Sequence, residues 1–153
     1  MRGFILLKPE AIQRNLTGKI ITILEEKGLK ISAIKMLFPS KEQIVDLYQE
    51  HIELEYFNNI IECSTDGPVI AMIVETIFGT DASVIATDLQ GDINLPGTIR
   101  YQFALHKSRN VIHCSKNYKE AEREIQIFFS NEELLEYVKE QEKWLVESIT
   151  TKV

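Results

Sequence analysis

The sequence predicts a single α/β domain in which helices cover a sheet. Short apolar runs of strand length alternate along the chain with segments in which apolar residues recur at helical spacing. The chain has 153 residues, of which 44% are hydrophobic and 26% charged, a composition typical of one globular domain with its own core. No internal repeat, linker or low-complexity segment divides it, so we expect one domain over residues 1–153.

The first part of the chain has clear strand and helix signals. Residues 3–7, "GFILL", form an apolar run that a lysine and a proline end, which favours a buried strand. Residues 16–28 carry apolar side chains at helical spacing, with Thr17 able to cap the start and Gly28 the end. Residues 29–38 alternate and then shift phase, which predicts a strand with a bulge or with two covered faces.

The middle of the chain continues this alternation. Ser40 and Gln43 form a capping-box pattern, which predicts a helix after Ser40. Residues 68–74, "PVIAMIV", are apolar without alternation, as in a central strand covered on both faces. Residues 80–89 indicate a short helix, and residues 90–103, with their glycines and proline, indicate a loop.

The last part of the chain predicts one more strand and two helices. Residues 110–113 are of strand length, and Asn117 begins a capping pattern ahead of a helix through residues 121–129. A further capping pattern at Ser130 predicts that residues 130–153 form a C-terminal helical extension. Its inner stripe would consist of Leu134, Leu135, Val138 and Leu145.

The charge pattern favours a small anionic ligand. The formal net charge of -6 argues against a general affinity for nucleic acid or acidic membranes. Cations nevertheless cluster between residues 98 and 123, where only Glu120 and Glu122 oppose them: Arg100, Lys107, Arg109, Lys116, Lys119 and Arg123. A small anion could therefore be received beside His113, which lies inside this segment.

Cysteine, histidine and apolar patterns indicate a cytoplasmic protein without a metal cage. Cys63 and Cys114 form neither a C-x-x-C pair nor a disulfide framework, which suits a reducing compartment. The histidines at 51, 106 and 113 are scattered and suggest no zinc ligand set. The start, "GFILLKPE", lacks the long apolar region of a signal peptide, and no apolar run reaches membrane-spanning length.

His113 is the residue whose surroundings suggest chemistry. It precedes a predicted helix N-terminus, and Glu124 lies two turns into that helix, where it could fold back to the imidazole. A carboxylate on one ring nitrogen fixes the other nitrogen as a nucleophile or base. The helix N-terminus and nearby cations would favour a phosphate. A satisfied, half-buried histidine at a strand end is the plain alternative.

Five ordered motifs settle which family the chain resembles. The runs are "LLKPEAIQRNLTGKII", "DGP" at Asp66, "LPGTIR" at Leu95, "RNVIHCS" at Arg109 and "AEREI" at Ala121. In order and spacing, this pattern resembles the nucleoside diphosphate kinases. The resemblance implies a ferredoxin-like antiparallel sheet covered by helices. It also implies that the terminal phosphate of a nucleoside triphosphate passes to a nucleoside diphosphate through a phosphohistidine, with Mg²⁺ carried on the phosphates.

The resemblance assigns a catalytic group to five residues. His113 would be the phosphorylated nucleophile, Glu124 would hold its other nitrogen, and Ser115 would support that pair. Lys8 would reach the transferring phosphate and the sugar, and Tyr48 would place its hydroxyl beside the histidine. Phosphoryl transfer asks a protein mainly for positioning and for positive charge near the phosphate oxygens.

The resemblance also implies a nucleotide-binding group. Arg100 would neutralise phosphate oxygens, Asn110 would bind the sugar hydroxyl, and Tyr56 would stack on the base. Lys107 stands where the family has an apolar residue facing the base. The family also forms homo-oligomers, so a hexamer, tetramer or dimer is expected.

Several positions depart from the family pattern. The short helix over residues 80–89 lacks the usual phosphate-binding arginine, with Ser83 or Val84 near its place, and Leu89 falls about where a threonine is usual. Two further departures follow "PGTIR" and the histidine: Tyr101 and Gln102, then Cys114 and Lys116. Lys107 or Lys116 could restore part of the missing charge.

Other interpretations stay open at this point. Tyr48 could be a core residue, Lys8 a solvated strand-end charge, and Glu124 the partner of a surface cation. The chain could accordingly be a catalytically weak nucleotide-binding or protein-interaction domain derived from the family. A regulatory domain of similar shape is a second rival, although it would have no need of a histidine and glutamate pair.

Overall fold

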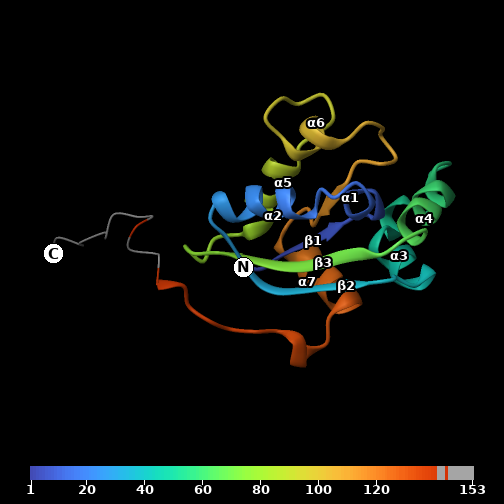
Figure 1. Cartoon of the computed structure of the whole chain (residues 1–153). Helices are drawn as coiled ribbons and strands as arrows, with labels where there is room; N and C mark the ends of the chain where they lie inside the picture. Colours follow the sequence, from blue (N-terminus) through green and yellow to red (C-terminus); the bar gives the residue numbers. More distant parts are fainter. Residues whose placement is uncertain (141–143, 145–153) are drawn as a thin grey trace.

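The computed structural model describes residues 1–140 and residue 144 (Figure 1). Its strands are β1 (Gly3–Leu7), β2 (Leu29–Leu37), β3 (Val69–Thr76) and β4 (Ile112–Cys114). Its α-helices are α1 (Pro9–Gln13), α2 (Thr17–Glu26), α3 (Lys41–Leu47), α4 (Phe57–Thr65), α5 (Ala82–Gln90), α6 (Ile99–Phe103) and α7 (Tyr118–Phe128). Two single 3-10 turns, η1 (Gln49–His51) and η2 (Asn131–Glu133), complete the described elements.

The four strands form one antiparallel sheet in the order β2-β3-β1-β4. Strands β1 and β3 lie inside the sheet, which explains why "GFILL" and "PVIAMIV" are apolar without alternation. The pairing of β2 with β3 shifts register between Ile31 and Ala33, so the predicted bulge is confirmed. Strand β4, which carries His113, lies at the edge of the sheet.

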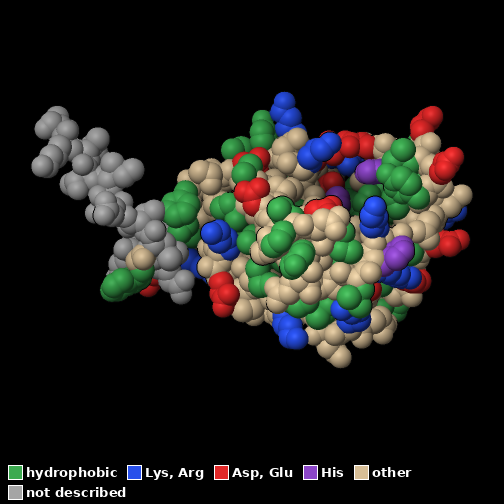
Figure 2. All heavy atoms as spheres, turned by 90° about the horizontal axis from the view of Figure 1, so that it is seen from above, with side chains coloured by type: hydrophobic (Ala, Val, Ile, Leu, Met, Phe, Trp, Pro, Cys, Tyr) green, Lys and Arg blue, Asp and Glu red, His purple; other side chains and the backbone are tan. Residues whose placement is uncertain are grey.

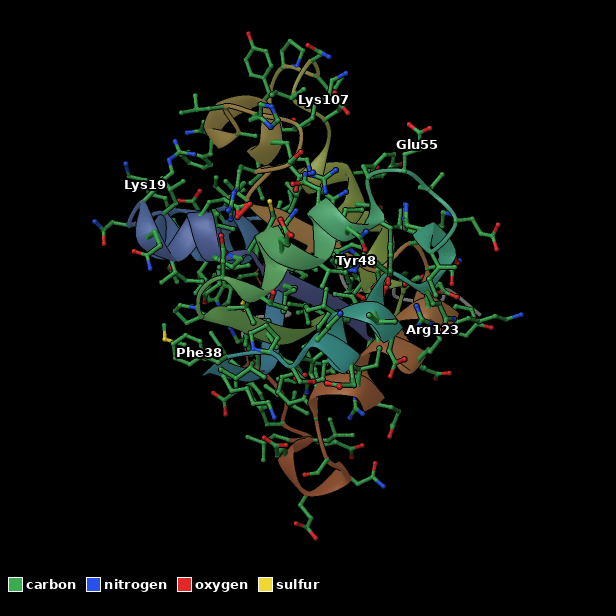
Figure 3. The ribbon with its side chains drawn as sticks, turned by 90° about the vertical axis from the view of Figure 1, so that its right-hand side faces the viewer. Lys19, Phe38, Tyr48, Glu55, Lys107 and Arg123 are labelled. Carbon is green, nitrogen blue, oxygen red and sulfur yellow. The ribbon has the colours of Figure 1, made fainter. Side chains whose placement is uncertain are left out.

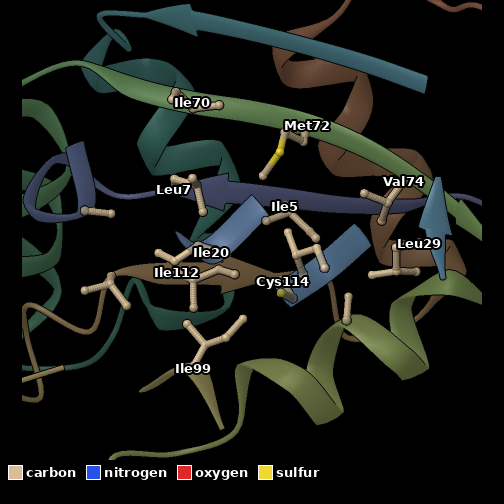
Figure 4. Packing of buried hydrophobic residues seen from close by; sticks show 14 of the residues in the cluster. Ile5, Leu7, Ile20, Leu29, Ile70, Met72, Val74, Ile99, Ile112 and Cys114 are labelled. Atoms are coloured by element: carbon tan, nitrogen blue, oxygen red, sulfur yellow. The ribbon is translucent and has the colours of Figure 1, made fainter. Parts of the chain in front are cut away.

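Helices cover both faces of the sheet, so the predicted sheet-and-helix architecture is confirmed. On one face, α2, α5 and α6 pack against β-strand side chains that include Ile5, Met72 and Ile112 (Figure 4). On the other face, α3, α4 and α7 pack against strand side chains that include Phe4 and Ile73. Burial of these two apolar layers is the main force that holds the sheet and helices together.

Local capping signals explain where several helices begin. Ser40 and Gln43 form the predicted reciprocal capping box at the start of α3. Asn117 accepts a hydrogen bond from the backbone N–H of Glu120 and thereby begins α7. At the end of α2, Gly28 has a φ of 87°, a conformation that glycine adopts without strain.

Two assignments from the sequence are wrong. The segment 90–103 is not entirely loop, because α6 begins at Ile99, where the Thr98 hydroxyl accepts a hydrogen bond from Tyr101 N. Residues 134–139 form no helix, so the predicted helical extension fails there. Part of the remaining extension, including Leu145, lies outside the described residues.

Contacts with the sheet explain why the tail after η2 is not helical. Lys30 donates to the carbonyl of Tyr137, and the Tyr137 hydroxyl donates to the carbonyl of Ile31. Of the predicted stripe, Leu134 is partly buried against the core, whereas Leu135 and Val138 are 60% and 80% exposed. These contacts hold the tail beside β2 in a non-helical conformation.

Candidate active site

His113 lies in β4, at the point where the two halves of a cleft formed by loops and helix ends meet. The cleft has two halves that share Tyr48, His51 and His113. The α5 half is lined by Thr87, Gln90, Lys116 and three glutamates, Glu50, Glu120 and Glu124. The loop half is lined by Lys8, Tyr56, Arg100, Lys107 and Asn110.

The imidazole of His113 is held by a buried carboxylate. Its Nε2 lies 3.2 Å from Oε1 of Glu124, and the two side chains are 17% and 4% exposed. With Nε2 turned to Glu124, Nδ1 is the ring nitrogen that makes no contact with this carboxylate. The predicted fold-back of Glu124 from α7 to the histidine is thus present in the structure, and a neutral imidazole that donates Nε2–H to this carboxylate would carry a free lone pair on Nδ1.

A tight turn before β4 places Asn110 beside Lys8. Val111 has a φ of 66°, and the N–H of Ile112 donates to the carbonyl of Asn110 at 2.9 Å, closing a three-residue turn. This conformation is strained for a β-branched residue, and Val111 is completely buried, so packing maintains it. The turn lets the side-chain oxygen of Asn110 accept from Nζ of Lys8 at 2.9 Å.

Two partly or fully buried cations lie in the loop half. Lys8 is 6% exposed, and burial lowers the pKa of its ammonium group. Arg100 donates to the carbonyl of Ile112, while its Nε is buried without a hydrogen-bond partner. Burial also lowers the pKa of Arg100, although a guanidinium stays charged at neutral pH. The solvated-lysine alternative for Lys8 is therefore wrong.

Aromatic rings form the wall between the two halves. The Tyr48 ring meets His113 edge-on with centroids 5.3 Å apart, and burial raises the pKa of its hydroxyl. Tyr56 is the N-cap residue directly before α4, and its side chain is 53% exposed at the mouth of the loop half. Figure 3 shows Tyr48 near the centre of this side of the molecule, with the loop that carries Lys107 above it and Arg123 below.

His51 is a cleft residue that the sequence reasoning missed. Its ring lies between those of Tyr48 and Tyr56, with centroids 6.0 Å and 6.5 Å away. The available signal was its position three residues after Tyr48, which places both side chains on one side of a helical turn.

Ser115 makes no hydrogen bond with the pair that it was predicted to support. Its hydroxyl accepts from the N–H of Phe4 and shares a hydrogen bond with the Ser83 hydroxyl at 3.1 Å. Neither His113 nor Glu124 is among its hydrogen-bond partners. The contact of Ser115 is thus with β1 and α5, and it fixes the strand end that carries the histidine.

The cation cluster read from the sequence divides into two groups. Arg109 pairs with Asp66 and Glu10, and Arg123 with Glu120, so these arginines are neutralised locally. Lys116 lies 3.8 Å from Glu50. Lys107 is exposed and lines the loop half. Figure 2 shows histidine, lysine and arginine side chains on the right-hand part of the face, the side where α4 lies in Figure 1.

Helix α5 contributes no cation to the cleft. Of the two positions considered for the missing arginine, Ser83 is fully buried, whereas Val84 is 54% exposed. Thr87, which lies one turn beyond both positions, lines the cleft, so the exposure of the two side chains decides which of them could be extended toward it. A side chain from Val84 could therefore reach toward the cleft, whereas one from Ser83 could not.

Comparison with known proteins identifies the family. The model of the family described as nucleoside diphosphate kinase matches residues 1–134. The chain belongs to the nucleoside diphosphate kinase family. A nucleoside diphosphate kinase of Archaeoglobus fulgidus is 43% identical over 150 residues, which cover 95% of this chain and 97% of that protein. One from Listeria monocytogenes is 41% identical over 146 residues, covering 93% and 97%.

Solved structures of the family share the fold. The nucleoside diphosphate kinase of Halobacterium salinarum, solved in complex with CDP, matches with a TM-score of 0.88 and 34% identity, over 96% of this chain and 99% of that one. A family protein from Babesia bovis matches with a TM-score of 0.85. The predicted ferredoxin-like kinase fold and the predicted enzyme class, a phosphotransferase, are confirmed.

No helix among the described residues is long and apolar enough to cross a membrane.

Proposed function

We propose that this nucleoside diphosphate kinase works through a phosphohistidine at His113. Nδ1 would attack the terminal phosphorus of a nucleoside triphosphate, and the bond from that phosphorus to the bridging oxygen of the diphosphate would break. The phosphoryl group would then pass from Nδ1 to a second nucleoside diphosphate. The observation that carries this proposal is the 3.2 Å contact of Nε2 with buried Glu124, which leaves one ring nitrogen reactive.

The other cleft residues have roles that follow from their charge and place. Lys8 and Arg100 would neutralise charge on the transferring phosphate, because both cations lie in the half of the cleft that His113 shares. The Tyr48 hydroxyl would donate a hydrogen bond to a phosphate oxygen. Burial raises the pKa of this hydroxyl, which keeps its proton in place. His51 would be a further donor at this wall.

The nucleoside would lie in the loop half. Asn110, which Lys8 already holds, would bind a sugar hydroxyl, and the exposed ring of Tyr56 would stack on the base. A ring face accepts any base, so broad substrate use is expected. Ser115 acts in this proposal only through the strand end that it fixes.

Magnesium would reach the cleft on the nucleotide phosphates. No group of three or more histidine, cysteine, aspartate or glutamate side chains that could hold a metal occurs in the described part of the chain. Mg²⁺ usually keeps several of its waters and is bound through substrate phosphates and one or two carboxylates, and the α5 half of the cleft contains the carboxylates of Glu50, Glu120 and Glu124. When bound, the ion supplies further neutralisation of the phosphate oxygens.

The reaction is tested by following phosphate on the protein. The purified chain is incubated with labelled ATP and Mg²⁺, and an acid-labile, base-stable label is expected on the protein. Addition of unlabelled GDP or UDP should remove this label and produce labelled triphosphate. A protein that binds ATP but acquires no label would instead fit a catalytically weak nucleotide-binding domain.

We also propose a homo-oligomer in the cytoplasm. Three apolar side chains of β2 and its end are 50%, 60% and 77% exposed: Ile34, Met36 and Phe38. An apolar row on an edge strand is a surface that pairing with another chain would cover. The mass of the purified protein in solution tests this, and a monomer at all concentrations would contradict it.

A further inference from the structure

Gln90 is the last residue of α5 and lines the α5 half of the cleft together with His113. Its side-chain Oε1 accepts a hydrogen bond from the backbone N–H of Cys114 at 2.7 Å. Cys114 is the residue directly after His113 in β4, and β4 is the edge strand of the sheet. The side-chain carbonyl of Gln90 therefore accepts a hydrogen bond from a backbone N–H at the sheet edge, directly beside His113.

This contact fixes the orientation of the Gln90 amide. A flipped amide would turn its NH₂ group toward the N–H of Cys114 and bring two donors face to face, so Oε1 must be the atom on Cys114. The NH₂ group then points away from β4. It makes no hydrogen bond within the described chain and is not among the buried unpartnered atoms, so it faces the solvent of the cleft.

The α5 half of the cleft lacks any other suitable donor from its helix. The α5 sequence, "ASVIATDLQ", contains no lysine or arginine, and the Thr87 hydroxyl already donates within α5. Lys116 and Arg123 lie near carboxylates, at 3.8 Å from Glu50 and 2.9 Å from Glu120. A nucleotide whose phosphates reach His113 would meet the free NH₂ group of Gln90 on this side.

We propose that Gln90 is a phosphate-binding positioning residue with two separate functions, an inference that rests on the proposed phosphohistidine function. Its carbonyl holds the edge strand directly after His113, and its NH₂ group donates to a phosphate oxygen of the bound nucleotide. A neutral amide thereby provides the phosphate contact on the side of the cleft where α5 offers no cation. A hydrogen bond to a charged phosphate is worth roughly tenfold to a hundredfold in affinity.

Two substitutions separate these functions. Gln90→Glu keeps an acceptor for Cys114 N but has no donor, so the thermal midpoint should stay near that of the parent while binding of a nucleoside diphosphate weakens at least tenfold. Gln90→Lys has a donor but no acceptor, so the thermal midpoint should fall while binding is retained. Thr87→Glu is the charge control, because it adds a carboxylate to the same half and leaves Gln90 intact.

The measurements are calorimetric binding of ADP and GDP to the unphosphorylated protein and thermal unfolding. Opposite patterns for Gln90→Glu and Gln90→Lys, with a smaller loss for Thr87→Glu, support the proposal. Parent-like binding by Gln90→Glu, or equal losses in Gln90→Glu and Thr87→Glu, would overturn it. Phosphoenzyme formation by the parent is recorded separately, so failure of the histidine mechanism is distinguished from failure of the Gln90 assignment.

Discussion

The carboxylate on His113 makes a quantitative prediction. Glu124→Gln preserves the shape of the side chain and can still accept a hydrogen bond from Nε2, but it removes the negative charge. The contact is 3.2 Å long and its two side chains are 17% and 4% exposed, so solvent screens it weakly. A charge-assisted hydrogen bond contributes about 1–2 kcal/mol more than a neutral one, which corresponds to a roughly 5- to 30-fold slower transfer.

The rate of phosphoenzyme formation in a single turnover measures this effect directly. Glu120→Gln is the matched control, since Glu120 also lies on α7 and lines the cleft but bonds to Arg123 rather than to the histidine. The control should retain the parent rate. Glu124→Gln reacting as fast as the parent, or both variants slowing equally, would refute the assignment of Glu124 as the group that supports His113.

Three further predictions concern charge and packing. Because burial lowers the pKa of Lys8 below the ordinary value of 10.5, its charge is lost at a lower pH than that of a free lysine. Nucleotide binding should therefore weaken as the pH rises through that lowered pKa. In a titration of binding, Lys8→Arg should remove this loss at alkaline pH. Val84→Arg should tighten binding of a nucleoside diphosphate about tenfold, as measured by calorimetry. Ser83→Arg, at a fully buried position, should instead lower the thermal midpoint. If Val84→Arg gave no gain in affinity, this face of α5 would not reach the phosphates. Tyr137→Ala removes the hydrogen bond from the tail to the carbonyl of Ile31 and should lower the thermal midpoint by about 2–4 °C. The rate of phosphoenzyme formation should stay unchanged, and an altered rate would mean that the tail acts on the site.

Hydrophobic periodicity and capping patterns predicted much of the fold. The strands β1, β2 and β3 and the starts of α3 and α7 follow from local signals, because apolar runs and Ser40 or Asn117 caps act within a few residues. Helix α6 is only five residues long and follows a proline and a glycine, so its pattern resembled a loop. The tail could not be predicted, since its path depends on contacts of Tyr137 with distant β2.

The residues of the candidate site that lie in recognisable motifs were predictable from the sequence. The pairing of His113 with Glu124 was predicted from the sequence pattern, and the roles of Lys8 and Asn110 were predicted from the resemblance. The structure brings these residues together in two pairs. The contacts of Ser115 with β1 and α5 could not be foreseen, because they depend on which elements pack beside the end of β4. Gln90 was missed for the same reason, since its partner is a backbone N–H twenty-four residues away.

The atom that carries the phosphate provides the most direct test of the proposed mechanism. The parent is phosphorylated with ATP, and the labelled residue and ring nitrogen are identified by mass spectrometry and by phosphorus NMR of the native protein. His51→Gln serves as a matched control, because His51 lies in the same cleft. We predict phosphate on Nδ1 of His113, retained in His51→Gln and absent in His113→Gln, whose fold is unchanged. Phosphate on Nε2, on another residue, or still formed at the parent rate in His113→Gln would contradict the mechanism.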